Sequence, residues 1–324
     1  MNNLSILVKR EYWEHRGGFL WTPVWVCGVI LGLSLLGMIS AEVFRARVGV
    51  QLGGMSLGAV RAAISAQDYA HAGYAFDVTQ VMFAAIPCIA LFFVLFFYLL
   101  GALYDDRRDR SVLFWKSLPV SDAATVVSKV LSAMLLAPLV ALVVSTLAYL
   151  VFVVLVSAWL ALHGLNVLPA LAASHPLRTL WRLLLTVPLD ALWALPTIGW
   201  LLFWSAWSRS KPFLWAVMVP LLAVFANWWL GVLGAPHFGG LLDLAHMAGR
   251  LLLSVMPGSW LSADAGGLRQ WLPNPQALDD GGLLHPARML DTATSPGLWL
   301  GVVVGVALIG AAIWARRRRI ETSV

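Results

Sequence analysis

Six long stretches with almost no charge constrain this chain more than any other feature of its sequence. Five of them contain no Asp, Glu, Lys or Arg, and the sixth contains only Asp190. A helix needs about 20 apolar residues to cross a bilayer core of about 30 Å, so each stretch is long enough to span. The predicted spans cover residues 19–41, 78–104, 131–162, 183–204, 213–233 and 297–315.

The composition excludes a soluble globular protein. Hydrophobic residues make up 60% of the 324 positions and charged residues only 12%, whereas a soluble domain carries about 25% charged residues. We therefore predict an all-α polytopic membrane protein with six transmembrane helices. The expected organisation is a single six-span domain over 19–324, in contact with lipid, preceded by a separate helix over 1–18.

The basic residues predict the orientation of the spans. Fourteen of the 22 lysines and arginines fall in segments 1–18, 105–130, 205–212 and 316–324. The positive-inside rule places such segments in the cytoplasm, so both termini are expected there. This topology also accounts for the net charge of +6 without nucleic acid as a partner. We expect a multi-pass protein of the bacterial cytoplasmic (inner) membrane.

The first 18 residues are typical of an interfacial amphipathic helix. Leu4, Leu7, Val8 and Tyr12 recur at helical spacing, while most charged residues fall elsewhere. The pair at 17–18, two glycines, is expected to turn the chain from the membrane surface into the first span.

An apolar segment before the last span is too short and too interrupted to cross the membrane. Asp243, His246 and Arg250 share one predicted helical face within 241–261. This segment is expected to be re-entrant from the outer side. Residues 262–295 are rich in Gly, Pro and Asp and are expected to form an outer loop.

Motifs for bound nucleotide or metal are absent from the sequence. It contains no G-x-x-x-x-G-K-[ST] phosphate loop and no H-x-x-x-H or H-E-x-x-H pair. We therefore expect no cofactor, no metal and no catalytic residues on this chain. Cys27 and Cys88 lie within apolar runs, where cysteine behaves as a small buried hydrophobe.

Asp190 is the one ionisable residue within the spans, and two interpretations of it remain open. Intramembrane carboxylates commonly serve a substrate path or a gate. Alternatively, Arg178 or Arg182 on the same predicted helix forms an ion pair with it through a long side chain.

Glycine pairs at G-x-x-x-G spacing permit close helix packing in two spans. Gly28 and Gly32 form one pair, and Gly301 and Gly305 form the other. Both packing within the chain and a dimer face, for which Gly28 and Gly32 are the candidates, agree with the spacing.

The predicted cytoplasmic loop 105–121 is the most informative segment for function. It begins with charges of both signs and continues with an apolar, amphipathic stretch before Pro119. Such a stretch either lies on the bilayer surface or binds a cytoplasmic partner. The candidate contact residues are Asp105, Asp106, Arg107, Arg108, Phe114, Trp115, Lys116 and Leu118.

Two motifs of this loop resemble those of the permease subunits of bacterial type-2 ABC exporters. They are the run Tyr104-Asp105-Asp106-Arg107-Arg108 and the stretch from Phe114 to Ser121. The layout of nearly the whole chain is similar too, including the start of the N-terminal helix at 8–11. The resemblance implies that the loop is a coupling helix bound by a separate ATPase subunit, which holds ATP and Mg, and that two permeases pair as a homodimer.

The resemblance thus predicts a permease that exports a hydrophobic or amphipathic substrate with ATP hydrolysed by its partner. Two other classes agree with the residues alone. One is a membrane scaffold or sensor that recruits a cytoplasmic protein through the same loop. The other is an integral membrane enzyme, for which the sequence supplies neither a G-x-S-x-G motif nor a second intramembrane Asp.

Overall fold

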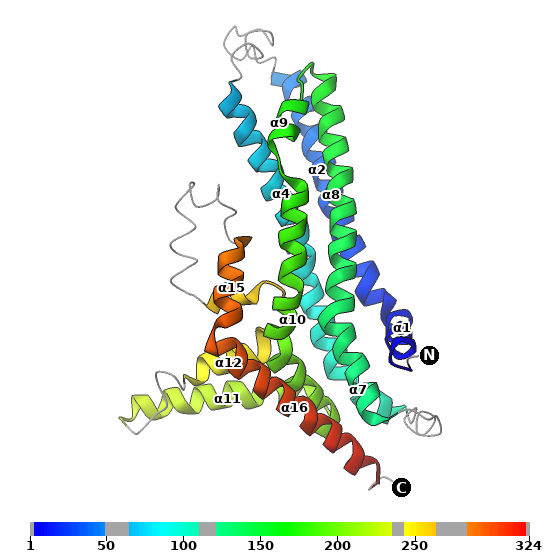
Figure 1. The fold of residues 1–324 in the computed structure, drawn as a ribbon, viewed down its shortest axis with the longest axis vertical. Helices are drawn as coiled ribbons and strands as arrows, with labels where there is room; N and C mark the ends of the chain where they lie inside the picture. The colour runs from blue at the N-terminus through cyan, green and yellow to red at the C-terminus, as the bar shows by residue number, and fades with distance from the viewer. Residues whose placement is uncertain (1–2, 49–64, 110–120, 235–242, 264–283, 322–324) are drawn as a thin grey trace. The chain divides into compact units, whose positions relative to one another are not determined.

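The computed structural model describes residues 3–48, 65–109, 121–234, 243–263 and 284–321, and these ranges are helical with no strand (Figure 1). Six helices in them are long and apolar enough to cross a membrane. For these residues, the prediction of a helical fold with six long apolar helices is therefore confirmed. The principal helices are α2 (Thr22–Val48), α4 (Ala66–Gly101), α8 (Ala137–Leu162), α10 (Pro176–Trp207), α11 (Pro212–Val232) and α16 (Pro296–Glu321).

Most of these helices extend beyond the uncharged stretches. The helix α4 begins at Ala66, well before the predicted start at residue 78. Its start is set by a capping box, in which Asp68 Oδ2 accepts a hydrogen bond from Ser65 N at 2.8 Å and Ser65 Oγ accepts one from Asp68 N at 3.2 Å. Hydropathy alone misses such helix ends, because the first turn of a helix can consist of polar residues.

The N-terminal helix α1 (Asn3–Arg16) continues through a kink at His15 into the short π-helix η1 (Gly17–Trp21). The two glycines therefore lie in helical backbone, and the kink lies just before them, at His15. At Gly18 a Cβ would lie 2.6 Å from Val94 Cγ1. The absence of a side chain allows close packing against α4.

By its internal contacts the chain forms two compact units. One unit comprises residues 20–90 and 140–185, with α2, α8, parts of α4 and α10, and the short helix α9 (Leu168–Ala173). Its core contains Cys27, Phe83 and Tyr149. Neither cysteine forms a disulfide bond; Cys27 is buried, as the sequence predicts, and Cys88 is half-buried.

The second unit comprises residues 1–19, 91–139 and 186–324. Besides α1, α11 and α16 it contains α5 (Tyr104–Arg108), α7 (Asp122–Leu131), η2 (Ser132–Leu136), α12 (Leu244–Leu253), η4 (Ser259–Ala263) and α15 (Pro286–Thr294). The helix α1 packs on α7 and η2, and α12 packs on α11. One core cluster of this unit joins Leu189, Trp193, Trp260, Met289 and Leu298.

The segment before the last span contains more structure than the sequence predicts. Within the described residues, α12 is followed by a turn at Gly258, whose φ is +81°, and then by η4. The expected loop over 262–295 is partly wrong, because α15 forms within it. His285 caps this helix, Pro286 occupies its first turn, and Met289 is buried in the core.

Candidate functional site

The junction between α4 and α5 is fixed on the end of α10. Ser205 Oγ accepts hydrogen bonds from the backbone N–H groups of Leu103 and Tyr104 at 2.9 and 3.0 Å. Arg107 Nη2 donates to the carbonyl oxygens of Ser205 at 2.6 Å and Ser208 at 3.1 Å. Arg107 therefore satisfies carbonyl groups that a helix end leaves without internal partners.

A buried network of charges lies beside this junction. We call it the charge network, and it consists of Glu11, Asp106, Asp122, Lys129 and Arg316. Lys129 Nζ lies 3.2 Å from Glu11 Oε1 and 3.8 Å from Asp106 Oδ2. The side chains of Glu11, Lys129 and Arg316 are only 1%, 2% and 4% exposed. Buried charges of this kind need partners of opposite sign, because their desolvation is costly.

Arg316 joins the two flanks of the segment 110–120. Its Nη1 lies 3.3 Å from Asp106 Oδ2 on α5, and its Nε lies 3.1 Å from Asp122 Oδ1 at the start of α7. The helix α16 therefore holds both ends of this segment through one guanidinium group. Ser121 begins α7 as its N-cap, with Oγ accepting from Ala124 N at 3.1 Å.

Glu11 connects the N-terminal helix to the same network. Its Oε2 accepts a hydrogen bond of 2.8 Å from the Tyr98 hydroxyl, and Arg10 Nη2 lies 3.2 Å from its Oε1. The carboxylate, which is almost fully buried, thus has Tyr98, Arg10 and Lys129 among its partners. Five separate parts of the chain, α1, α4, α5, α7 and α16, meet at the three carboxylates and two cations of the charge network.

The loop residues singled out from the sequence divide into two groups. Asp106 and Arg107 point into the chain and form the contacts above, whereas Asp105 and Arg108 are exposed on α5. The remaining four candidates, Phe114, Trp115, Lys116 and Leu118, lie outside the described residues. Contact of this loop with a partner stays a prediction.

The sequence reasoning missed Glu11, Lys129 and Arg316 as members of one site. It treated them as parts of a polar N-terminus, a loop and a basic tail. A signal for Glu11 was present, because it follows Leu4 by seven residues and Leu7 by four. These intervals place it on the apolar face of α1, where an acidic side chain requires a partner.

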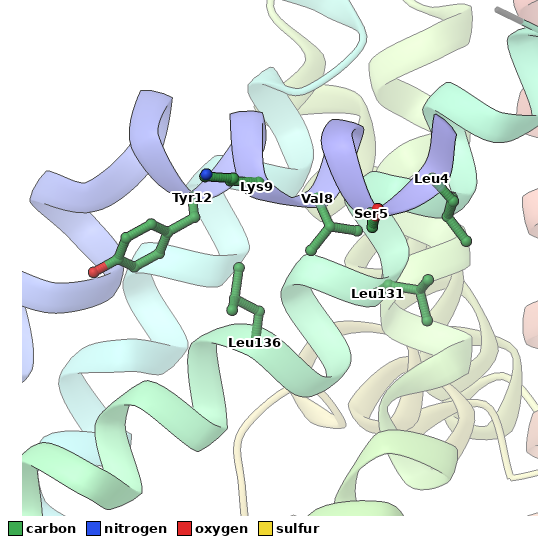
Figure 2. A pocket seen from close by; sticks show the side chains of 7 residues that line it. All are labelled: Leu4, Ser5, Val8, Lys9, Tyr12, Leu131 and Leu136. Atoms are coloured by element: carbon green, nitrogen blue, oxygen red, sulfur yellow. The ribbon is translucent and has the colours of Figure 1, made fainter. Parts of the chain in front are cut away.

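The apolar face of α1 packs within the chain. Figure 2 shows Leu4, Val8 and Tyr12 directed toward the helix that carries Leu131 and Leu136. Together they line a groove of about 510 Å³ between α1 and α7–η2. The amphipathic helix is thus present, and its placement at a membrane interface stays a prediction.

Asp190 supports the turn at Gly258. Its Oδ1 accepts a hydrogen bond of 2.7 Å from Gly258 N. In the ranges described, no ion pair joins it to Arg178 or Arg182, so the expected pairing is not found. A role in a substrate path or gate stays a prediction.

The two glycine pairs differ in their surroundings. Around Gly28 and Gly32 a Cβ would meet no described atom within 4 Å, which leaves a dimer face as a prediction. At Gly305 a Cβ would lie 2.6 Å from the Leu195 carbonyl oxygen, and at Gly199 it would lie 2.6 Å from the Gly305 carbonyl oxygen. The glycines of the last span therefore serve packing between α10 and α16.

Among the described residues, no group of three or more His, Cys, Asp or Glu side chains is arranged to hold a metal ion. Comparisons with models of protein families, with curated proteins and with solved structures found no match for this chain. Interpretation of the site therefore depends on its own geometry.

Proposed function

We propose that this chain is the permease subunit of an ABC exporter in the bacterial cytoplasmic membrane. A separate cytoplasmic subunit binds ATP and Mg and hydrolyses the nucleotide, and the loop 105–121 is its contact. Two copies of the permease form a homodimer with both termini in the cytoplasm. The permease performs no bond chemistry, and its cargo is hydrophobic or amphipathic.

The observation that carries this proposal is the attachment of both loop flanks to Arg316. A loop that is pushed by a partner moves a transporter only when its displacement reaches the spans. Here the flanks contact α16 through Arg316 and α1 through Lys129 and Glu11. Closure of an ATPase pair would in this way shift spans between inward-open and outward-open states.

The exposed part of α5 supports the same proposal. Asp105 and Arg108 remain at the surface while their neighbours Asp106 and Arg107 are held inside. The short helix thus has an internal face that is fixed and an outer face that a cytoplasmic partner can contact.

Substitution of Trp115 tests the proposed contact. Loss of an aromatic anchor at an interface costs about 2 kcal/mol, which is about thirtyfold in affinity. The matched control is Trp25→Ala, since Trp25 on α2 is 70% exposed and lies outside the loop. The measurement is co-purification of an ATP-binding subunit with the tagged permease at equal membrane levels, together with ATP turnover in lipid nanodiscs.

We expect Trp115→Ala to lose the ATPase and Trp25→Ala to retain it. Equal recovery of the ATPase by both variants would show that the loop is not the coupling element. Recovery of a cytoplasmic partner that binds no ATP would support the alternative of a scaffold or sensor.

The proposed orientation is tested by single cysteines in a Cys27→Ala, Cys88→Ala background. Ser121→Cys and Ser323→Cys should resist an impermeant maleimide applied to intact spheroplasts, and Asp280→Cys should react. Labelling at either of the first two positions would contradict cytoplasmic placement of the loop or the C-terminus.

A further inference from the structure

A cavity of about 670 Å³ lies among α10, α12, η4, α15 and the start of α16, all within one compact unit. Its volume falls within the range of about 300–1,000 Å³ that is usual for small-molecule sites. Apolar side chains, Trp193, Trp260 and Leu261, line one part of it. Charged and polar side chains line the rest.

Arg250 is the central charge of this cavity. Its guanidinium carbon lies 3.5 Å from the centre of the Trp193 ring, and its Nη2 is buried with no hydrogen-bond partner in the part of the chain that the structure describes. The missing side chain of Gly301 leaves the space for this group. A cation–π contact offsets only part of the cost of burying a cation.

The other polar groups of the lining include a second arginine, two histidines and one acidic residue. His285 and Arg288 are half-buried on the wall formed by α15, and His246 lies one turn before Arg250 on α12. Asp291 is the acidic side chain of the lining, and it is exposed. His285 Nδ1 accepts a hydrogen bond of 3.1 Å from Ala287 N, so its Nε2 carries the proton and is a donor.

The charge of Arg250 persists under ordinary conditions. Burial lowers the pKa of its guanidinium to about 10, which is still far above neutral pH. The cavity therefore combines a persistent, half-buried cation, further basic groups and an aromatic surface. A fitting ligand has an anionic end and an apolar end.

We propose that this cavity binds an acidic amphiphile, with its phosphate or carboxylate group at Arg250 and its apolar part against Trp193, Trp260 and Leu261. The bound oxyanion compensates the buried charge of Arg250. The proposal does not depend on the proposed ATPase partner, because it rests only on contacts within one unit of this chain.

Titration of the full chain in neutral dodecyl maltoside micelles tests the proposal by calorimetry. The probes are dioctanoyl phosphatidate, its uncharged counterpart dioctanoylglycerol, and inorganic phosphate. We expect binding of the phosphatidate and at least tenfold weaker binding of the other two. Equal binding of dioctanoylglycerol, or equal binding of inorganic phosphate, would overturn the assignment of an acidic amphiphile.

Two variants locate the binding. Arg250→Gln removes the charge and should weaken phosphatidate at least tenfold, since a hydrogen bond to a charged group is worth about 1.5–3 kcal/mol. Gly297→Leu keeps every charge and narrows the cavity, because a Cβ at Gly297 meets nothing within 4 Å. It should also weaken binding at least tenfold.

The matched control is Gly310→Leu, on the same helix and equally free of neighbours within 4 Å but away from the cavity. It should bind phosphatidate within twofold of the unmodified chain. If Gly297→Leu binds as tightly as Gly310→Leu, the cavity is not the site. The comparison of Gly297→Leu with Gly310→Leu shows whether the cavity is the binding site even if Arg250→Gln fails to fold.

Discussion

Two regions of the same unit bury basic side chains, and they differ in what surrounds each charge. In the charge network, Lys129 and Arg316 each lie near two carboxylates. At the cavity, Arg250 rests on the ring of Trp193, and its Nη2 has no partner in the described residues. Arg316 lies on α16 itself, Lys129 lies on α7, which packs against α16, and Arg250 lies against Gly301 of α16.

This difference indicates that the charge network stabilises the fold, whereas the charge of Arg250 can bind a ligand. A cation with two carboxylates is already compensated and gains little from a ligand. A cation that has only an aromatic face remains incompletely compensated, and a ligand can supply the missing charge. The same replacement of a basic residue by an apolar one should therefore destabilise the fold much more in the charge network than at the cavity.

The largest expected effect comes from Lys129→Met. The substitution removes the 3.2 Å ion pair between Lys129 and Glu11 and leaves the Glu11 carboxylate buried. The free energy of unfolding should fall by about 3 kcal/mol, because this buried charge has lost its main partner. Reversible unfolding in mixed micelles measures this change in the free energy of unfolding. The control Glu14→Gln removes an ion pair whose carboxylate is 54% exposed and should cost less than about 0.5 kcal/mol.

The next effect concerns α16, which contacts both regions. Gly305→Ala places a Cβ 2.6 Å from the Leu195 carbonyl oxygen, so the helices must separate, at a cost of about 1–3 kcal/mol. Gly310→Ala meets nothing within 4 Å and should stabilise α16 slightly, since alanine favours helix over glycine. Equal unfolding free energies for the two variants would contradict the close crossing of α10 and α16.

A smaller effect is expected at the flank of the loop. Ser121→Ala removes the N-cap of α7 and should cost about 1 kcal/mol, with fraying of the turn that holds Asp122 near Arg316. Hydrogen exchange of the amides 122–125 reports the fraying directly. Ser40→Ala on α2, where the hydroxyl is exposed and bonds only the Gly37 carbonyl, should leave those amides unchanged.

The smallest effect is expected for Arg250→Met in the absence of ligand. Loss of the cation–π contact with Trp193 is offset by relief of an uncompensated buried charge, so the free energy of unfolding should change by less than about 1 kcal/mol. The same mixed-micelle assay applies. A loss near that of Lys129→Met would mean that Arg250 is as fully compensated as Lys129 and would remove the contrast between the regions.

Several features of the fold follow from short stretches of sequence. The uncharged runs predict the six long apolar helices. The intervals on α12 predict that His246 and Arg250 share a face, and both line one cavity. Asp243 is an exception, because its carboxylate caps the helix at Ala245 N instead of joining that face.

The sequence by itself determined that the chain suits a lipid environment, that its fold is helical and how many long apolar helices it contains. It does so because backbone groups in lipid must bond within their own helix, which makes each span a local property of about 20 residues. Only the tertiary structure decided which charges meet. Glu11 and Lys129 are 118 positions apart, and Asp106 and Arg316 are 210 apart, so no local pattern specifies their pairing, which depends on how the helices pack.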